Sequence, residues 1–225
     1  AIRNGACCHL FSEGKPQGNA VKVNDTLIAL QDLAKFERKR ITGDVIGVTG
    51  SVGKTTTKDI LFASLRNLTE VHVSKLSFNN ELGLPLTILS AETSTKHLIL
   101  EMGARGPGQI AELAKIANPT IGIVTRVASA HTEFFQDIDH IAETKGALVE
   151  LLPSSGTAIL NNDDPRVAEM SKRTNAEIVT YGLEDATVTA RKISINNDLT
   201  TNFEIVSPWG TATARMNIPG VHNVT

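Results

Sequence analysis

The 225-residue sequence is poor in aromatic residues and carries almost no net charge. Aromatic side chains make up only 4% of the residues and the formal net charge is −2, so neither a basic field nor a stacking platform for nucleic acid is indicated. No window reaches the roughly 18 continuous apolar residues of a membrane-spanning helix, and no signal peptide opens the sequence. We therefore expect a cytoplasmic protein without a nucleic-acid partner.

Cysteine is also scarce, because Cys7 and Cys8 are the only two and they are neighbours. Adjacent cysteines rarely form an ordinary disulfide, and so few in a chain of this length argue against an oxidising compartment. We expect both to be small buried hydrophobic side chains.

What the sequence does contain is a regular alternation of apolar, strand-like runs with helix-like runs. At 41% hydrophobic residues the chain can bury a substantial core, and its length suits one large domain or one and a half. The alternation predicts an α/β fold with a mostly parallel sheet and helices on both faces. Strands are predicted near 44–49, 70–74, 97–101, 120–125, 157–160 and 177–181. Helices are predicted near 54–66, 81–89, 107–117, 137–152 and 164–174.

The residue patterns at the two ends of the sequence differ from the pattern of its middle. Three shorter alternating segments after about residue 186 predict a small antiparallel β extension at the C-terminal end: 187–195, 200–206 and 211–218. A helix is predicted over 26–40, preceded by loops rich in Gly and Asn. We take 39–43 as the joint between a leading piece, residues 1–43, and a nucleotide-binding domain, residues 44–225.

Residues 49–56 read Thr-Gly-Ser-Val-Gly-Lys-Thr-Thr between a predicted strand and a predicted helix, which is the pattern of a phosphate-binding loop. Gly50 and Gly53 would let backbone N–H groups converge on an anion at the positive end of the helix. Lys54 would reach the terminal phosphates and Thr55 a magnesium ion. The candidate nucleotide-binding residues are therefore Thr49, Gly50, Ser51, Val52, Gly53, Lys54, Thr55 and Thr56.

The loop departs from the full G-x-x-x-x-G-K-[ST] pattern at one position, because Val48 stands where the first glycine is expected. The alternative interpretation is a glycine-rich turn that only caps a helix.

Ligands of a parallel sheet gather at the carboxyl ends of its strands, so the residues that follow each strand are candidates for function. Glu101 ends one predicted strand and is placed to hold magnesium, with a solvated carboxylate as the alternative. His131 follows another strand, and a neutral imidazole can complete a metal shell. By itself, His131 is better explained as a structural residue.

Lys145 lies in the middle of the apolar stripe of the helix predicted over 137–152. An isolated buried ammonium group costs several kcal/mol, so it must be paired, depressed in pKa or chemically modified. The alternative is a side chain that extends along the helix to water. The apolar neighbours of Lys145 on this face are Ile138, Ile141, Ala142, Leu148, Val149 and Leu152.

Seven separate motifs, in order, resemble the Mur ligase family of peptidoglycan synthesis. They are TGSVGKTTTKDIL (49–61), SFNNELGLPLTIL (77–89), LEMGARGPGQI (100–110), AH (130–131), AETKGALVELL (142–152), AILNNDD (158–164) and GVHN (220–223). The resemblance covers residues 44–225 well and 1–40 weakly. It is strongest to the members that add a D-alanyl-D-alanine dipeptide.

This resemblance implies an ATP-dependent ligase that phosphorylates the peptide carboxylate of a UDP-N-acetylmuramoyl-tripeptide and then joins it to D-alanyl-D-alanine. It implies ATP and two Mg²⁺ ions as cofactors, and a monomer. It further implies that Lys54, His131 and Lys145 are catalytic, that Lys145 is carbamylated, and that Thr55, Glu101, His131 and Lys145 hold the metals. By the same resemblance Asn79 and Asn80 line the groove for the muramoyl-peptide, and His222 and Asn223 border the adenine.

Two departures and two alternatives accompany the resemblance. Arg126 stands where the family usually has asparagine, and the chain lacks most of a leading domain and the trailing ligase domain of the family, so we expect it to be a fragment. The alternatives are another amide ligase of the superfamily, such as a diaminopimelate- or lysine-adding enzyme or a folylpolyglutamate synthase, or a non-catalytic nucleotide-binding module.

Overall fold

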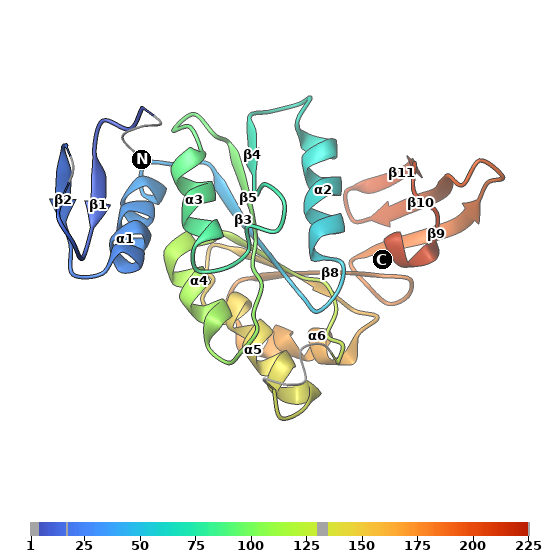
Figure 1. Ribbon diagram of the computed structural model, residues 1–225. Helices are drawn as coiled ribbons and strands as arrows, with labels where there is room; N and C mark the ends of the chain where they lie inside the picture. The colour runs from blue at the N-terminus through green and yellow to red at the C-terminus, as the bar shows by residue number, and fades with distance from the viewer. Residues whose placement is uncertain (1–4, 17, 130–134, 225) are drawn as a thin grey trace.

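The computed structural model describes residues 5–16, 18–129 and 135–224 and shows a nine-stranded sheet flanked by helices (Figure 1). Its strand order is β11-β10-β9-β8-β7-β6-β3-β5-β4, and the neighbours from β4 to β9 run parallel. The first six strands of this sheet are β3 (Asp44–Thr49), β4 (Val71–Val73), β5 (His97–Glu101), β6 (Ile121–Val124), β7 (Thr157–Asn161) and β8 (Glu177–Gly182). All six fall on predicted strands.

Helices cover both faces of this sheet, as the alternation predicts. The strand residues Val45 and Leu98 pack against α3, α4 and α5, whereas their sequence neighbours Ile46 and Ile99 pack on the opposite face beside α2. This follows from the two-residue repeat of a strand, because both faces must be apolar when both are covered. The helices are α2 (Lys54–Leu65), α3 (Gly83–Ser90), α4 (Gln109–Ala117), α5 (Ile138–Glu150) and α6 (Pro165–Glu169).

Several helix boundaries differ from the prediction by one or more residues, and local side-chain caps mark the starts of two of these helices. Asn80 accepts hydrogen bonds from the N–H groups of Leu82 and Gly83, so α3 begins at Gly83 and Glu81 lies before its first turn. Asp164 caps α6 through the N–H of Arg166, and this helix changes at Met170–Arg173 into the 3₁₀ helix η2 instead of continuing as one α-helix.

The C-terminal segments form the expected antiparallel extension, which continues the same sheet. Strands β9 (Val188–Ile195), β10 (Thr201–Ser207) and β11 (Gly210–Met216) pair antiparallel with one another. Strand β9 joins β8 in parallel, through the pairs Tyr181–Val188 and Gly182–Thr189. The extension therefore projects beyond the helix-covered part of the sheet, at the right of Figure 1.

The leading residues contain two short strands that the sequence did not predict. Strands β1 (His9–Phe11) and β2 (Ala20–Lys22) pair in parallel ahead of α1 (Thr26–Arg38). The prediction that Cys7 and Cys8 are buried is wrong, because both are exposed, although both are free thiols as expected. Cys7 and Cys8 directly precede β1 of this two-stranded sheet, and the described residues form no second layer over their thiol groups.

Helix α1 joins the main body through Arg38, whose buried guanidinium group clamps the end of α4. Its nitrogens donate to the carbonyls of Ala117 at 2.6 Å, Asn118 at 2.9 Å and Ile41 at 2.9 Å. The last carbonyls of α4 have no partner within the helix, so Arg38 satisfies groups that would otherwise be buried without a hydrogen bond.

We expect the Arg38→Met substitution to lower the free energy of unfolding by about 2–4 kcal/mol, because three carbonyls, two of them buried, lose a charged donor. Urea denaturation followed by circular dichroism measures this change. The matched control is Arg40→Met, since Arg40 is exposed and pairs with Glu37 on the surface, and its effect should stay within about 0.5 kcal/mol. Equal losses of unfolding free energy in Arg38→Met and Arg40→Met would contradict the role of Arg38 in holding the end of α4.

No helix in the described part of the chain is both long enough and apolar enough to cross a membrane.

Candidate active site

The turn between β3 and α2 has the backbone shape that a phosphate-binding loop requires. Gly50 has φ +148° and Gly53 has φ +86°, a region that residues with a side chain rarely adopt. A Cβ atom on Gly50 would also collide with the Thr125 hydroxyl. Gly53 is the N-cap of α2, so the turn leads directly to the positive end of that helix.

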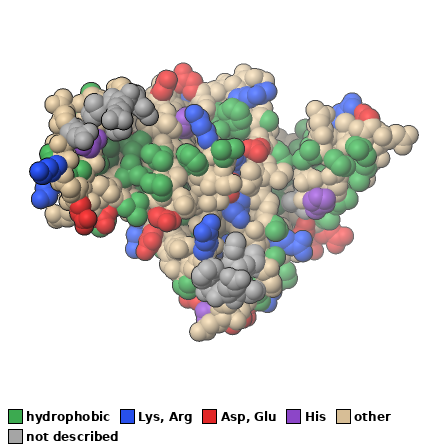
Figure 2. All heavy atoms as spheres, viewed as in Figure 1, with side chains coloured by type: hydrophobic (Ala, Val, Ile, Leu, Met, Phe, Trp, Pro, Cys, Tyr) green, Lys and Arg blue, Asp and Glu red, His purple; other side chains and the backbone are tan. Residues whose placement is uncertain are grey.

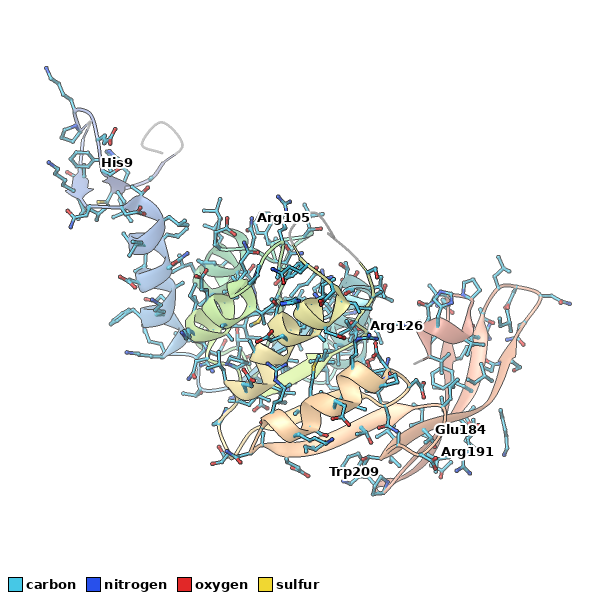
Figure 3. All side chains as sticks on the ribbon, turned by 90° about the horizontal axis from the view of Figure 1, so that it is seen from below. His9, Arg105, Arg126, Glu184, Arg191 and Trp209 are labelled. Carbon is cyan, nitrogen blue, oxygen red and sulfur yellow. The ribbon has the colours of Figure 1, made fainter. Side chains whose placement is uncertain are left out.

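The loop is held from behind by the segment that follows β6. The Ser51 N–H donates to the carbonyl of Arg126 at 2.6 Å, and the Thr125 hydroxyl donates to the carbonyl of Val52 at 2.6 Å. Because Arg126, labelled in Figure 3, contributes here through its main chain, the departure from asparagine leaves this contact intact. Asp164 fixes the same segment by accepting the Val127 N–H at 2.8 Å.

Lys54 folds back over the loop. Its Nζ donates to the carbonyls of Gly50 at 2.8 Å and Ser51 at 3.2 Å. Burial lowers the pKa of the Lys54 ammonium, and the negative charge of Glu101 partly offsets that effect. A cation in this position lies directly above a cradle suited to phosphate.

Glu101 is 1% exposed at the end of β5, so the alternative of a solvated carboxylate is wrong. Its Oε2 accepts the Thr55 hydroxyl at 2.9 Å, and its Oε1 accepts the Asn79 side-chain amide at 2.8 Å. The carboxylate thus joins the first turn of α2 to the loop before α3. A buried carboxylate beside a threonine hydroxyl is a donor set of the kind that magnesium prefers.

Lys145 is 5% exposed on α5, which rejects the alternative of a side chain that reaches water. Burial lowers the pKa of its ammonium group to about 8, and repulsion from the nearby Lys54 acts in the same direction. Lys145 is therefore inward-pointing and close to the phosphate loop, as its place in the apolar stripe indicated.

Several of these groups line one cavity of about 580 Å³, and Glu101 is joined to its wall through Asn79. Gly50, Ser51 and Lys54 line one side, Asn79 and Asn80 another, and Lys145 approaches from α5. Figure 2 shows basic side chains at the centre of this face, near the N-terminal end of α2. Arg105, labelled in Figure 3, lines the cavity from the loop after β5.

The predicted residues His222 and Asn223 do not line this cavity. His131 lies outside the described residues. His222 and Asn223 belong to the 3₁₀ helix η3 (Val221–Asn223), and Asn223 lines a separate apolar cavity of about 560 Å³ beside α2. Trp209, labelled in Figure 3 on the C-terminal extension, lines the same second cavity.

Other residues of the predicted loop do not line this cavity either. Thr49 is buried and donates to the Met102 carbonyl, while Val52 and Thr56 are exposed. Within residues 5–16, 18–129 and 135–224, no three carboxylate, imidazole or thiol groups lie close enough together to hold a metal ion.

Comparison with known proteins decides the family. Residues 48–225 match the model of the Mur ligase middle domain, which is most of the chain. The chain belongs to the Mur ligase family. Its similarity to a UDP-N-acetylmuramoyl-tripeptide--D-alanyl-D-alanine ligase from Mycobacterium tuberculosis is 44% identity over 182 residues, or 80% of this chain and 36% of that protein.

Solved Mur ligases have the same fold. A crystal structure of MurF from Acinetobacter baumannii matches 99% of this chain and 49% of its own with a TM-score of 0.90 at 28% identity. A MurF ligase from Thermotoga maritima, in complex with ADP, matches 99% of this chain and 52% of its own with a TM-score of 0.88 at 31% identity. This Mur ligase chain thus spans between a third and about half of the proteins it matches.

Proposed function

We propose that the protein carrying this chain forms an amide bond at the expense of ATP, adding D-alanyl-D-alanine to a UDP-N-acetylmuramoyl-tripeptide in peptidoglycan precursor synthesis in the cytoplasm. The observation that carries this proposal is one cavity lined by the phosphate loop and the buried Lys145, with Glu101, which accepts the Thr55 hydroxyl, held to the lining residue Asn79. The 44% identity to a ligase of that name supports the choice of substrates.

In the proposed reaction the terminal phosphoryl group of ATP is transferred to the carboxylate at the peptide end of the UDP-linked substrate. The amine of the dipeptide attacks the acyl phosphate, an amide forms, and phosphate leaves, so ADP and phosphate are the other products. Each step brings anions together, and the protein must therefore supply alignment and positive charge. Lys54, held over the loop carbonyls, is placed to supply that charge.

We assign the groups around the cavity to this reaction by their chemistry. The loop of residues 49–56 binds the triphosphate through backbone N–H groups and Lys54. Magnesium, when bound, would supply positive charge that offsets the charge of the phosphate oxygens. The proposed magnesium ligands are Thr55, Glu101, His131 and Lys145. The proposed contacts to the organic parts of the substrates are Asn79, Asn80, His222 and Asn223.

An unmodified Lys145 is a poor metal ligand, so we propose that it is carbamylated. The neutral amine attacks CO₂, a C–N bond forms, and one proton is released, which leaves an N-carboxylate. This change replaces a buried cation beside Lys54 with an anion, and thereby removes the repulsion that lowers the pKa of Lys145. The resulting carboxylate oxygens suit magnesium.

We expect the uptake of CO₂ by Lys145 to increase with pH up to about pH 8 and then to level off. A lysine with a pKa of about 8 is about one quarter neutral at pH 7.5, whereas one with an ordinary pKa is neutral in about one molecule per thousand. Carbon-13 NMR of the protein in labelled bicarbonate measures the carbamate, with Lys145→Met as the control. A spectrum unchanged by that substitution would show that Lys145 stays a free amine.

The proposed activity is tested with the complete natural protein, Mg²⁺ and ATP. ADP release should require both the UDP-linked tripeptide and D-alanyl-D-alanine. Release that instead follows diaminopimelate, lysine or glutamate would identify another amide ligase, and nucleotide binding without any amine-dependent turnover would identify a non-catalytic module. Because the chain spans about a third of its relative, we expect residues 1–225 alone to bind ATP weakly and not to complete the ligation.

A further inference from the structure

A second lysine of α2, Lys58, is buried but does not line the cavity. Its side chain is 4% exposed and its Nζ has three acceptors. These are the carbonyl of Ser74 at 3.1 Å, the carbonyl of Leu76 at 3.4 Å and the carboxylate of Asp59 at 3.1 Å. Asp59 itself is 66% exposed, so the Ser74 carbonyl is the buried partner of this charge and the Leu76 carbonyl a partly buried one.

A buried ammonium group is a costly way to fill space, because an apolar side chain of similar length would avoid the loss of hydration. The carbonyls that Lys58 holds belong to a segment that needs an external support. Leu76 is 81% exposed and has φ +50°, a left-handed conformation that a leucine adopts only under constraint. The ammonium group therefore fixes the turn directly after β4.

This turn leads within three residues to Asn79, which contacts Glu101. The Ser74 hydroxyl accepts the N–H of Glu101 at 3.2 Å, and the Asn79 carbonyl accepts the N–H of Gly103 at 2.8 Å. Together with the bond from Asn79 to the Glu101 carboxylate, these contacts close a ring from α2 through the segment 74–80 to β5. Lys58 is the member of that ring that ties the segment to α2.

On the basis of the ligase activity proposed above, we propose that Lys58 is a positioning residue that sets segment 74–80 against α2 for binding of the UDP-linked acceptor. It acts through Asn79 and Asn80, which line the cavity. The nucleotide loop has its own supports from the segment after β6, so Lys58 affects the acceptor far more than the nucleotide.

The test uses the complete natural protein with the substitutions Lys58→Met and Lys58→Gln. We expect Lys58→Met to raise the KM for the UDP-linked tripeptide about tenfold or more, since the carbonyls of Ser74 and Leu76 lose their donor. The Kd of ADP, measured by calorimetry, should change less than about threefold, since the contacts of the loop remain. Lys58→Gln, which retains a donor, should lie between Lys58→Met and the wild type.

The matched control is Asp59→Asn, which removes the exposed carboxylate and leaves the carbonyl contacts in place. Its KM for the acceptor should stay within about twofold of the wild type. A fall in melting temperature with unchanged KM in Lys58→Met would overturn the positioning role, and so would equal losses of ADP and acceptor binding. If Lys58→Met does not fold, the same comparison in Lys58→Gln decides.

The outcome for the wild type separates this inference from the proposed function. If the wild-type protein shows no turnover that depends on the dipeptide, the ligase proposal fails whatever the variants do. If the wild type is active and Lys58→Met has the same acceptor KM, only the role of Lys58 is rejected.

Discussion

Lys145→Met in the complete natural protein is expected to lower dipeptide-dependent turnover by about a hundredfold to a thousandfold, the loss typical of removing one preorganised electrostatic contact. Methionine keeps the length and apolar contacts of the side chain on α5, so the helix should stay folded. What disappears is the charged group that the cavity holds beside Lys54. Steady-state kinetics at saturating ATP and acceptor measures the loss.

The sign of the missing charge is revealed by chemical rescue of a smaller variant, Lys145→Ala. If the lysine acts as a carbamate, acetate or formate should restore part of the activity, whereas methylamine should restore it if the lysine acts as an ammonium. The matched control is Lys115→Met, because Lys115 is exposed on α4. Wild-type turnover in Lys145→Met would show that Lys145 has no part in the reaction.

The burial of Lys145 could be predicted from the sequence because the information is local. Five of its six predicted apolar neighbours lie on α5, which ends at Glu150, and the 3.6-residue repeat alone places the lysine among them. The strands from Asp44 to Gly182 were predictable for the same reason, since each shows its apolar or alternating pattern within a few consecutive residues.

The role of Lys58 could not be predicted in this way. Its acceptors, the carbonyls of Ser74 and Leu76, come from a loop 16 and 18 residues further on, and main-chain carbonyls have no signature in sequence. Asp164 was missed similarly, because its contact with the Val127 N–H joins two loops 37 residues apart. Contacts between loops that are distant in the sequence can be identified only when the fold is known.

The failed prediction for Cys7 and Cys8 has a related cause. Cysteine side chains are usually buried in proteins, but burial needs a second layer of structure over them. The adjacent strands β1 and β2 have three residues each, too short for a repeat to be recognised. The local sequence pattern therefore predicted neither these two strands nor the exposure of the two thiol groups.

Glu101→Gln is expected to remove most of the advantage that magnesium gives to nucleotide binding. The substitution preserves the shape of the side chain and can keep the bond from the Thr55 hydroxyl, but it removes the buried negative charge at the end of β5. We expect the Kd of ADP with Mg²⁺ to rise about tenfold to a hundredfold, as for the loss of other groups that support a metal. The Kd without Mg²⁺ should change little.

Titration calorimetry with and without Mg²⁺ separates the two contributions, and Glu112→Gln on α4 is the matched control because that carboxylate is exposed. The geometry makes a second effect inevitable if Glu101 acts as proposed. Its Oε1 accepts the Asn79 amide, and a glutamine can offer an oxygen to only one of its two partners. Loss of magnesium dependence should therefore be accompanied by a higher KM for the acceptor. An unchanged response to Mg²⁺ in Glu101→Gln would mean that the carboxylate only organises the loop before α3.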